Sequence, residues 1–300
     1  MTATEPVGVE PLQALDGFAA YAVTTRSGPH VTMQAGVVQS GRFITTTSRD
    51  SLKAKCVRTH RVAAATIEHD DGSTEVVAGP TVSVDLRRPE SMLTDPAGAL
   101  IAGPATLRLA GDQLEQLLGY VEAAGKVPSG WLPHNRVLLV TRIDRSLRVE
   151  GFDLLDGSGD WTPELPAPAE LRRTEGLQPA SLPEVPEDVR HLVHADAPAR
   201  LGIATPEGPV VLPARWQGDD RFVLSAAALA QVRAELPGAG CATFDDSASR
   251  RPDEKRGVML RGYLDLVEVE GSRATVALRT ERITAWDGFS ASTSDVDHRS

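Results

Sequence analysis

Short apolar and β-branched runs, each ended by a turn, dominate the first half of the sequence. Ser-Gly-Pro, Ser-Gly and Asp-Asp-Gly separate several of them, and turns of this composition join neighbouring antiparallel strands. The pattern therefore predicts an antiparallel β-meander. Its strands are expected at Tyr21–Thr25, Val31–Val38, Arg42–Thr47, Val62–Glu68, Glu75–Val84 and Val137–Ile143.

Two segments of the first half have a helical pattern instead. The first, Ser51–Thr59, follows Ser48 and Asp50, either of which is a suitable N-cap residue. The second, Gly111–Ala124, places leucines and a valine at the i, i+3, i+4, i+7 spacing of one apolar helix face. The sequence thus predicts two helices between the strands.

The middle of the chain changes composition. From Asp156 to Glu187 it contains Gly-Ser-Gly and six prolines but few apolar residues, which favours extended and unpaired backbone. We interpret residues 156–187 as a linker. It separates a first domain at 1–155 from a second at 188–300.

Patterns of the first half return after the linker. Gly208-Pro209-Val210-Val211 repeats the turn at Gly28-Pro29-His30-Val31. Val258–Leu266, with Gly262 at its centre, resembles Val76–Val84 with Gly79, and Arg142-Ile143 is repeated as Arg282-Ile283. A strand and turn pattern that recurs in this way indicates two diverged copies of one mainly β domain.

Composition and charge restrict the classes of function. A length of 300 residues with 41% hydrophobic content suits two domains, and a net charge of −10 with no basic block disfavours nucleic acid as a partner. No leader segment and no long apolar run is evident, so we expect a soluble cytoplasmic protein and no membrane partner. A small-molecule substrate remains the expected partner.

Other polar groups suggest no additional site. Cys56 and Cys241 lie far from other metal-ligand residues in the sequence and are expected to be buried as small hydrophobic side chains, and the histidines share no helix face with a third ligand. We therefore predict no metal site. The acidic pairs Asp219-Asp220 and Asp245-Asp246 are expected in solvated turns.

The segment Gly41–Lys55 carries the clearest candidate chemistry. Thr46 and Thr47 end a predicted strand, and Ser51 and Lys53 begin the following helix. Hydroxyl groups, the free N–H groups of a helix start and a lysine in its first turn together favour an anion. This spacing predicts a phosphate-binding pocket.

These residues resemble the phosphate-binding signature of the pyridoxamine 5'-phosphate oxidase-like proteins, a family of split β-barrels that bind FMN or a deazaflavin coenzyme. The resemblance implies two tandem split β-barrel domains that form an intramolecular pseudo-dimer, a mainly β fold with few helices. It also implies that Thr32 and Met33 lie along the flavin ring and that the C-terminal residues Arg282 and Trp286 close the site.

The second half departs from the signature, since Phe222–Ala230 stands where the first half has Thr45–Lys53, with alanines at Ala226, Ala227 and Ala228 and with Arg233 as the nearest cation. We interpret the second half as a partner barrel without its own cofactor. The expected function is an FMN-binding oxidoreductase of unknown substrate, with a deazaflavin coenzyme as the alternative cofactor. No catalytic residue is identified, because the cofactor carries the reaction.

Two alternatives stay open. The chain could be a non-catalytic split-barrel module that serves as a cofactor carrier, a haem-binding protein or an interaction scaffold. The pseudo-dimer could also be a monomer or pair further into a homodimer.

Overall fold

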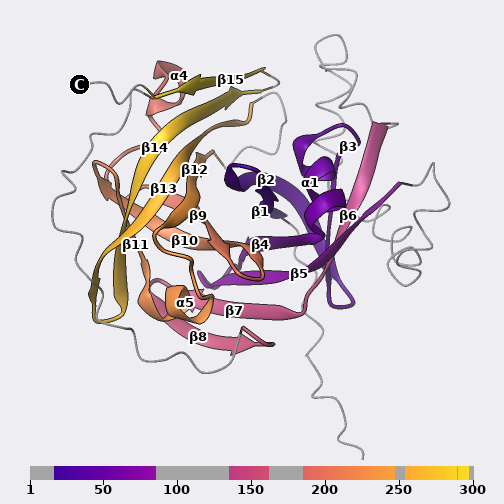
Figure 1. Ribbon diagram of the computed structural model, residues 1–300, viewed down its shortest axis with the longest axis horizontal. Helices are drawn as coiled ribbons and strands as arrows, with labels where there is room; N and C mark the ends of the chain where they lie inside the picture. The colour runs from indigo at the N-terminus through magenta and orange to yellow at the C-terminus, as the bar shows by residue number, and fades with distance from the viewer. Residues whose placement is uncertain (1–16, 86–134, 162–184, 247–253, 289, 297–300) are drawn as a thin grey trace, which may run out of the picture.

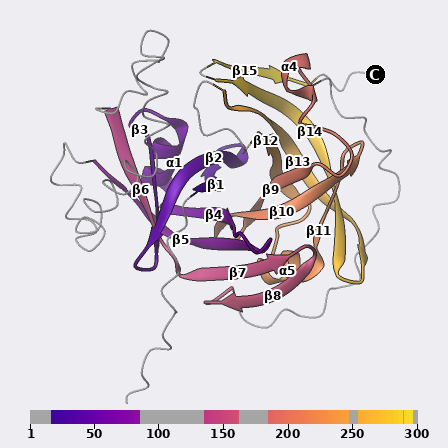
Figure 2. The same ribbon diagram turned by 180° about the vertical axis from the view of Figure 1, so that it is seen from behind.

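The chain folds into two β-barrels that lie side by side in the computed structural model (Figure 1). The structure describes residues 17–85, 135–161, 185–246, 254–288 and 290–296. Viewed from behind, the two barrels again occupy separate halves of the molecule, with β7 and β8 beneath them (Figure 2). The predicted helix at Gly111–Ala124 and most of the predicted linker fall outside the described residues.

The first barrel is a ring of antiparallel strands in the order β4-β1-β2-β3-β6-β5, closed by pairing between β4 and β5. A β7–β8 hairpin extends it from β5. The bounds are β1 Gly17–Thr25, β2 Gly28–Gln39, β3 Arg42–Ser48, α1 Leu52–His60, β4 Val62–Glu68, β5 Thr74–Val84, β6 Arg136–Arg142, β7 Arg145–Glu150 and β8 Asp153–Ser158.

The second barrel has the order β11-β10-β9-β12-β13-β14, closed by pairing between β11 and β14, with β15 added at β14. The bounds are α4 Glu187–Arg190, β9 Pro198–Thr205, β10 Gly208–Gly218, β11 Arg221–Ser225, α5 Ala226–Gln231, β12 Gly238–Asp245, β13 Arg256–Glu270, β14 Arg273–Asp287 and β15 Ser290–Asp295. The predicted mainly β fold of two tandem barrels is confirmed.

Both copies use the same turn to start their second strand. Thr25 Oγ1 donates to the Gly28 carbonyl at 2.7 Å, and Thr205 Oγ1 donates to the Gly208 carbonyl at 2.8 Å. The φ angles of the two glycines are +95° and +130°, a region that L side chains rarely adopt. The repeated Gly-Pro sequence therefore marks equivalent positions of the two barrels.

A close backbone crossing fixes a second pair of equivalent positions. A Cβ atom on Gly79 would lie 1.9 Å from the Arg142 carbonyl oxygen, and one on Gly262 would lie 1.8 Å from that of Arg279. Arg142 thus corresponds to Arg279. The predicted match of Arg142 with Arg282 is wrong, because identical Arg-Ile dipeptides occur three residues out of phase in the two strands.

The barrels contact one another through pseudo-symmetric hydrogen bonds. Thr66 Oγ1 of β4 donates to the Val211 carbonyl at 2.6 Å, and Thr243 Oγ1 of β12 donates to the Val31 carbonyl at 3.2 Å. In each barrel, the strand that follows the helix therefore contacts the second strand of the other barrel: β4 contacts β10, and β12 contacts β2. This arrangement is the predicted intramolecular pseudo-dimer.

The first barrel has an opening between β2 and β3. Strand β2 pairs with β1 from Gly28 to Gly36 but with β3 only from Gly36 to Gln39. The earlier part of β2 therefore has an edge that β3 does not cover. Helix α1 follows β3, and it packs Ala54 and Val57 into the core of this barrel.

Within the described parts of the chain, no helix is long and apolar enough to cross a membrane.

Candidate functional site

Helix α1 begins directly beside the end of β3. The Ser51 hydroxyl accepts a hydrogen bond from the Ala54 N–H at 3.1 Å, so Ser51 is the N-cap, and the expectation of Ser48 or Asp50 is wrong. Thr47 Oγ1 donates to the same hydroxyl at 3.0 Å. This contact ties the buried end of β3 to the first turn of the helix.

Lys53 extends from this first turn into the opening of the barrel. Its ammonium group donates to Thr32 Oγ1 on β2 at 2.9 Å. Burial, assisted by the positive charges of Arg136 and Lys255, lowers the pKa of Lys53 to about 7. No carboxylate pairs with Lys53 among the described residues, so its charge is not neutralised there.

Arg136 adds a second cation to the opening. It lies at the start of β6, opposite Ser48 of β3, and its Nε donates to Thr46 Oγ1 at 3.2 Å. Arg136 thus contacts Thr46, and its positive charge also acts on Lys53. A group of two cations, threonine hydroxyls and a helix start has the chemistry of an anion site.

The second barrel contributes Arg261 from β13 to this region. One terminal nitrogen of Arg261 lies 2.7 Å from Nδ1 of His30 on β2, across the boundary between the barrels. Burial, with the charges of Lys53 and Arg261, lowers the pKa of His30 to about 3. His30 is thus neutral near pH 7, and because Arg261 only donates, Nδ1 is the acceptor and the ring proton resides on Nε2.

Lys255 is the second cation from this barrel. Its ammonium lies 3.2 Å from the ring centre of Phe18, which is a cation–π contact. Burial lowers the pKa of Lys255 to about 8, and the charge of Asp245 opposes this shift. Lys255 directly precedes β13 of the second barrel, and its positive charge contributes to the lowered pKa of Lys53 in the first barrel.

Asp245 and Asp220 do not lie in solvated turns, and that expectation is wrong. Asp245 ends β12, where burial raises its pKa to about 6 although Arg200 and Lys255 lower it. Asp220 is 8% exposed. Asp245 lies near Arg200 and Lys255, and the backbone carbonyl of Asp220 accepts a hydrogen bond from Leu278 of β14.

Met33 and Trp286 border one apolar cluster between the barrels. Both side chains pack against residues that include Val31 of the first barrel and Met259 of the second. Trp286 also lies over Gly257 of the neighbouring strand, where any larger residue would collide with its ring. The structure therefore brings these two predicted residues to the same inter-barrel surface.

Arg282 lies apart from the other predicted residues. It pairs with Asp295 of β15 at 2.7 Å, and 45% of its side chain is exposed. In the strand register it stands opposite Arg261. The arginine that reaches the first barrel is thus the one on the adjacent strand.

The equivalent region of the second barrel is apolar at several positions. Counted from the shared glycines, Leu212 corresponds to Thr32, Val210 to His30 and Ala78 to Arg261, and all three belong to the main hydrophobic core. Ser225 caps α5 as Ser51 caps α1, but Ala227 replaces the lysine. One cation is kept, because Arg273 stands opposite Ser225 as Arg136 stands opposite Ser48, and its guanidinium lies over the Phe152 ring.

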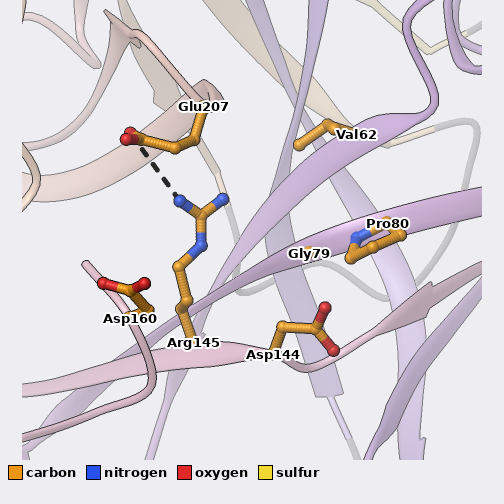
Figure 3. Close-up of a pocket in the computed structure, with 7 residues that line it drawn as sticks. All are labelled: Val62, Gly79, Pro80, Asp144, Arg145, Asp160 and Glu207. Carbon is orange, nitrogen blue, oxygen red and sulfur yellow. Dashed lines mark ion pairs between the residues drawn. The ribbon is translucent and has the colours of Figure 1, made fainter. Parts of the chain in front are cut away.

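A separate cavity of about 300 Å³ lies where the β9–β10 turn meets the first barrel (Figure 3). Arg145 points across it toward Glu207 at 3.7 Å, beside Asp144 and Asp160 (Figure 3). Carboxylates outnumber the arginine here, so this cavity does not have the charge of the Lys53 region. Its remaining walls are Val62, Gly79 and Pro80.

The predicted residues make up part of this region, and four further residues, two from each barrel, were not predicted. Thr32 with Lys53, Thr47 with Ser51, and Met33 with Trp286 lie together as pairs or on one surface. The missed residues come together only after folding, although Arg136 directly precedes a predicted strand and was detectable there. They are His30, Arg136, Lys255 and Arg261.

Burial of both cysteines agrees with the sequence interpretation. Cys56 and Cys241 are free and buried. Burial raises the pKa of Cys241 to about 11. Across the described residues no cluster of His, Cys, Asp and Glu forms a group suited to a metal ion.

Comparison with known proteins gives matches only at the level of structure. No protein-family model matches the chain, and no curated protein matches it. A pyridoxamine 5'-phosphate oxidase-related, FMN-binding protein from Nostoc punctiforme shares 15% identity, with 45% of this chain and 74% of that one covered and a TM-score of 0.33.

Two further solved structures are similar to the same degree. An F420 reductase shares 18% identity over 47% of this chain and 97% of its own, with a TM-score of 0.31. A haem-binding protein from Mycobacterium smegmatis shares 14% identity over 48% of this chain and 52% of its own, with a TM-score of 0.33. Each match spans about half of the chain.

Proposed function

We propose that this chain binds a phosphate-bearing flavin cofactor, FMN, at the opening of the first barrel and acts as an oxidoreductase. The observation that carries the proposal is the Lys53 ammonium, held by Thr32 beside Arg136 and Lys255 without a carboxylate partner in the described chain. Such a charge group is stabilised when an anion binds. Thr46, Thr47 and Ser51 lie around the same helix start.

The residues present fit a phosphate group. Lys53 and Arg136 would hold its negative charge, and Thr46 would orient an oxygen through its hydroxyl. The start of α1 adds N–H donors and a partial positive charge. Ser51 already caps one of those N–H groups, so its part is to position the helix rather than to bind the phosphate directly.

The apolar surface next to this charge group suits a flat ring. Met33 of the first barrel and Trp286 of the second border it, so both halves of the chain contribute. A flavin, when bound, supplies the hydride or electron transfer, and the protein binds and orients the reactants. A deazaflavin coenzyme is the alternative cofactor, since it also carries phosphate.

The proposal is tested first by an absorbance spectrum between about 300 and 500 nm of the protein purified from its native host, with mass analysis of any released ligand. A bound flavin that is bleached by reductant and restored by a substrate supports an oxidoreductase. A redox-silent or colourless protein that takes up neither cofactor would instead favour the non-catalytic module, and a strong Soret band would identify haem.

The phosphate assignment has a sharper test in matched variants. Lys53→Met should weaken FMN about 10-fold to 100-fold, because a hydrogen bond to a charged group contributes about 1.5–3 kcal/mol. Lys55→Met removes the same charge from an exposed position of α1 and should leave the affinity unchanged. Riboflavin, which lacks the phosphate, should bind both variants equally, as measured by fluorescence titration.

A further inference from the structure

Arg261 has donors that nothing in the described structure satisfies. Its Nε atom is buried and has no hydrogen-bond partner, while one terminal nitrogen contacts His30. Three other arginines on β13 and β14 differ, since Arg256 pairs with Asp287, Arg279 with Glu281 and Arg282 with Asp295. A buried N–H donor without an acceptor is costly unless a ligand such as an anion satisfies it.

The groups around Arg261 also favour the binding of an anion. Burial lowers the pKa of Arg261, and Arg282 on the adjacent strand lowers it further, while the thiols of Cys241 and Cys56 are the groups that oppose the shift. His30 accepts from Arg261 through Nδ1, which leaves its Nε2–H as a second donor. The Arg261 Nε–H and the His30 Nε2–H therefore both lack an acidic partner. They lie near the positive charge of Lys53.

We propose that Arg261 and His30 form a second anion subsite, which binds the acidic group of the substrate beside the cofactor phosphate. The inference rests on the proposed function and names its substrate class: a small carboxylate or phosphate ester. Because Arg261 comes from the second barrel and His30 from the first, this subsite exists only in the paired arrangement. It explains why the second barrel places a cation here, although the counterparts of Arg261 and His30 at the pseudo-equivalent position are the apolar Ala78 and Val210.

The test uses the full chain saturated with FMN, with inorganic phosphate and then acetate as probes. Side-chain NMR signals of Arg261 Nε–H and His30 Nε2–H should shift saturably in the wild type. Arg261→Gln should weaken the probe at least about tenfold, whereas Arg256→Gln, on the same strand but exposed and paired with Asp287, should leave it unchanged.

The possible results separate the two proposals. If FMN alone saturates the Arg261 and His30 signals and phosphate then has no effect, the pair belongs to the cofactor and the substrate inference is overturned. If neither FMN nor the probes move these signals, the subsite does not exist. If FMN fails to bind at all but the free protein responds to phosphate at Arg261, the anion subsite stands and the cofactor assignment falls.

Discussion

Lys53 illustrates how one buried side chain makes the site depend on pH. Its pKa is lowered to about 7 by burial and by Arg136 and Lys255, so it loses its charge within the physiological range. An anion binds the charged form better and therefore raises the pKa of Lys53 when it binds. Ligand binding at this residue is coupled to proton uptake.

We therefore expect FMN affinity to fall as the pH rises from about 6.5 to 8.5, across the pKa of Lys53. The sign follows because the protonated lysine predominates below pH 7 and the neutral amine above it. Lys255, with a pKa of about 8, adds to the same trend at the upper end. Fluorescence titrations at several pH values measure the effect.

Lys53→Arg is the control for this dependence, because a guanidinium stays protonated over the whole range. It should flatten the pH profile between 6.5 and 7.5 and leave the smaller contribution of Lys255. The phosphate group of FMN titrates identically with both proteins, so the difference between their profiles isolates the lysine. An equally steep profile in the arginine variant would contradict the assignment.

Individual residues of the site were predictable only where local sequence carries the chemistry. Thr47, Ser51 and Lys53 lie within seven residues of one another, and strand-end and helix-start rules locate them. Arg261 was missed and Arg282 was preferred, although the two stand opposite each other in adjacent strands. Both side chains leave the sheet on one face, but Arg282 turns to Asp295 and Arg261 reaches His30, a difference that arises from packing after folding and has no local signal in the sequence.

At the scale of elements, the start of α1 combines a structural and a functional contact. The Ser51 hydroxyl caps the helix and also accepts from Thr47, while Ser225 caps α5 in the same way at 3.2 Å from the Ala228 nitrogen. The two caps are structural equivalents. Only α1 has a lysine in its first turn that reaches the opening.

Ser51→Ala and Ser225→Ala should each lower the free energy of unfolding by about 1 kcal/mol, the usual cost of losing an N-cap. Ser51→Ala should in addition weaken FMN several-fold, because Lys53 then lies in a frayed first turn. Ser225→Ala should leave FMN affinity unchanged. Denaturant unfolding and ligand titration of both variants give the comparison, and equal effects on affinity would argue against α1 as the cofactor helix.

Element boundaries followed well from the strand pattern, since the predicted strands of the first half correspond to β1 to β6. The β7–β8 hairpin was not predicted. Its residues Arg145–Ser158 were assigned partly to the domain end and partly to the linker, yet Leu147 and Val149 belong to the core that the two barrels share. Burial supplied by another domain cannot be deduced from a short local pattern.

At the scale of the whole molecule, the two copies have taken different roles. The largest core cluster joins Val76, Ala78 and Leu147 of the first barrel to Val210 and Leu212 of the second. The repeat itself was visible in the sequence as the Gly-Pro turns. The loss of the phosphate-binding residues from the second copy was only partly visible, as the alanines on α5. The first barrel contributes the apolar Ala78 at the position equivalent to Arg261, and this equivalence became evident only from the strand pairing.

A pseudo-dimer in which Ala227 stands in place of Lys53 should bind one FMN per chain. Isothermal titration calorimetry of the full chain should give a stoichiometry of one, and Lys53→Met should reduce affinity without revealing another site. A second phosphate at the pseudo-equivalent position would meet Arg273 but no lysine, and Val210, Leu212 and Ala78 in the shared core offer it no polar partner. Two equivalents of FMN would show that α5 alone can bind phosphate, and the functional division between the barrels would then be wrong.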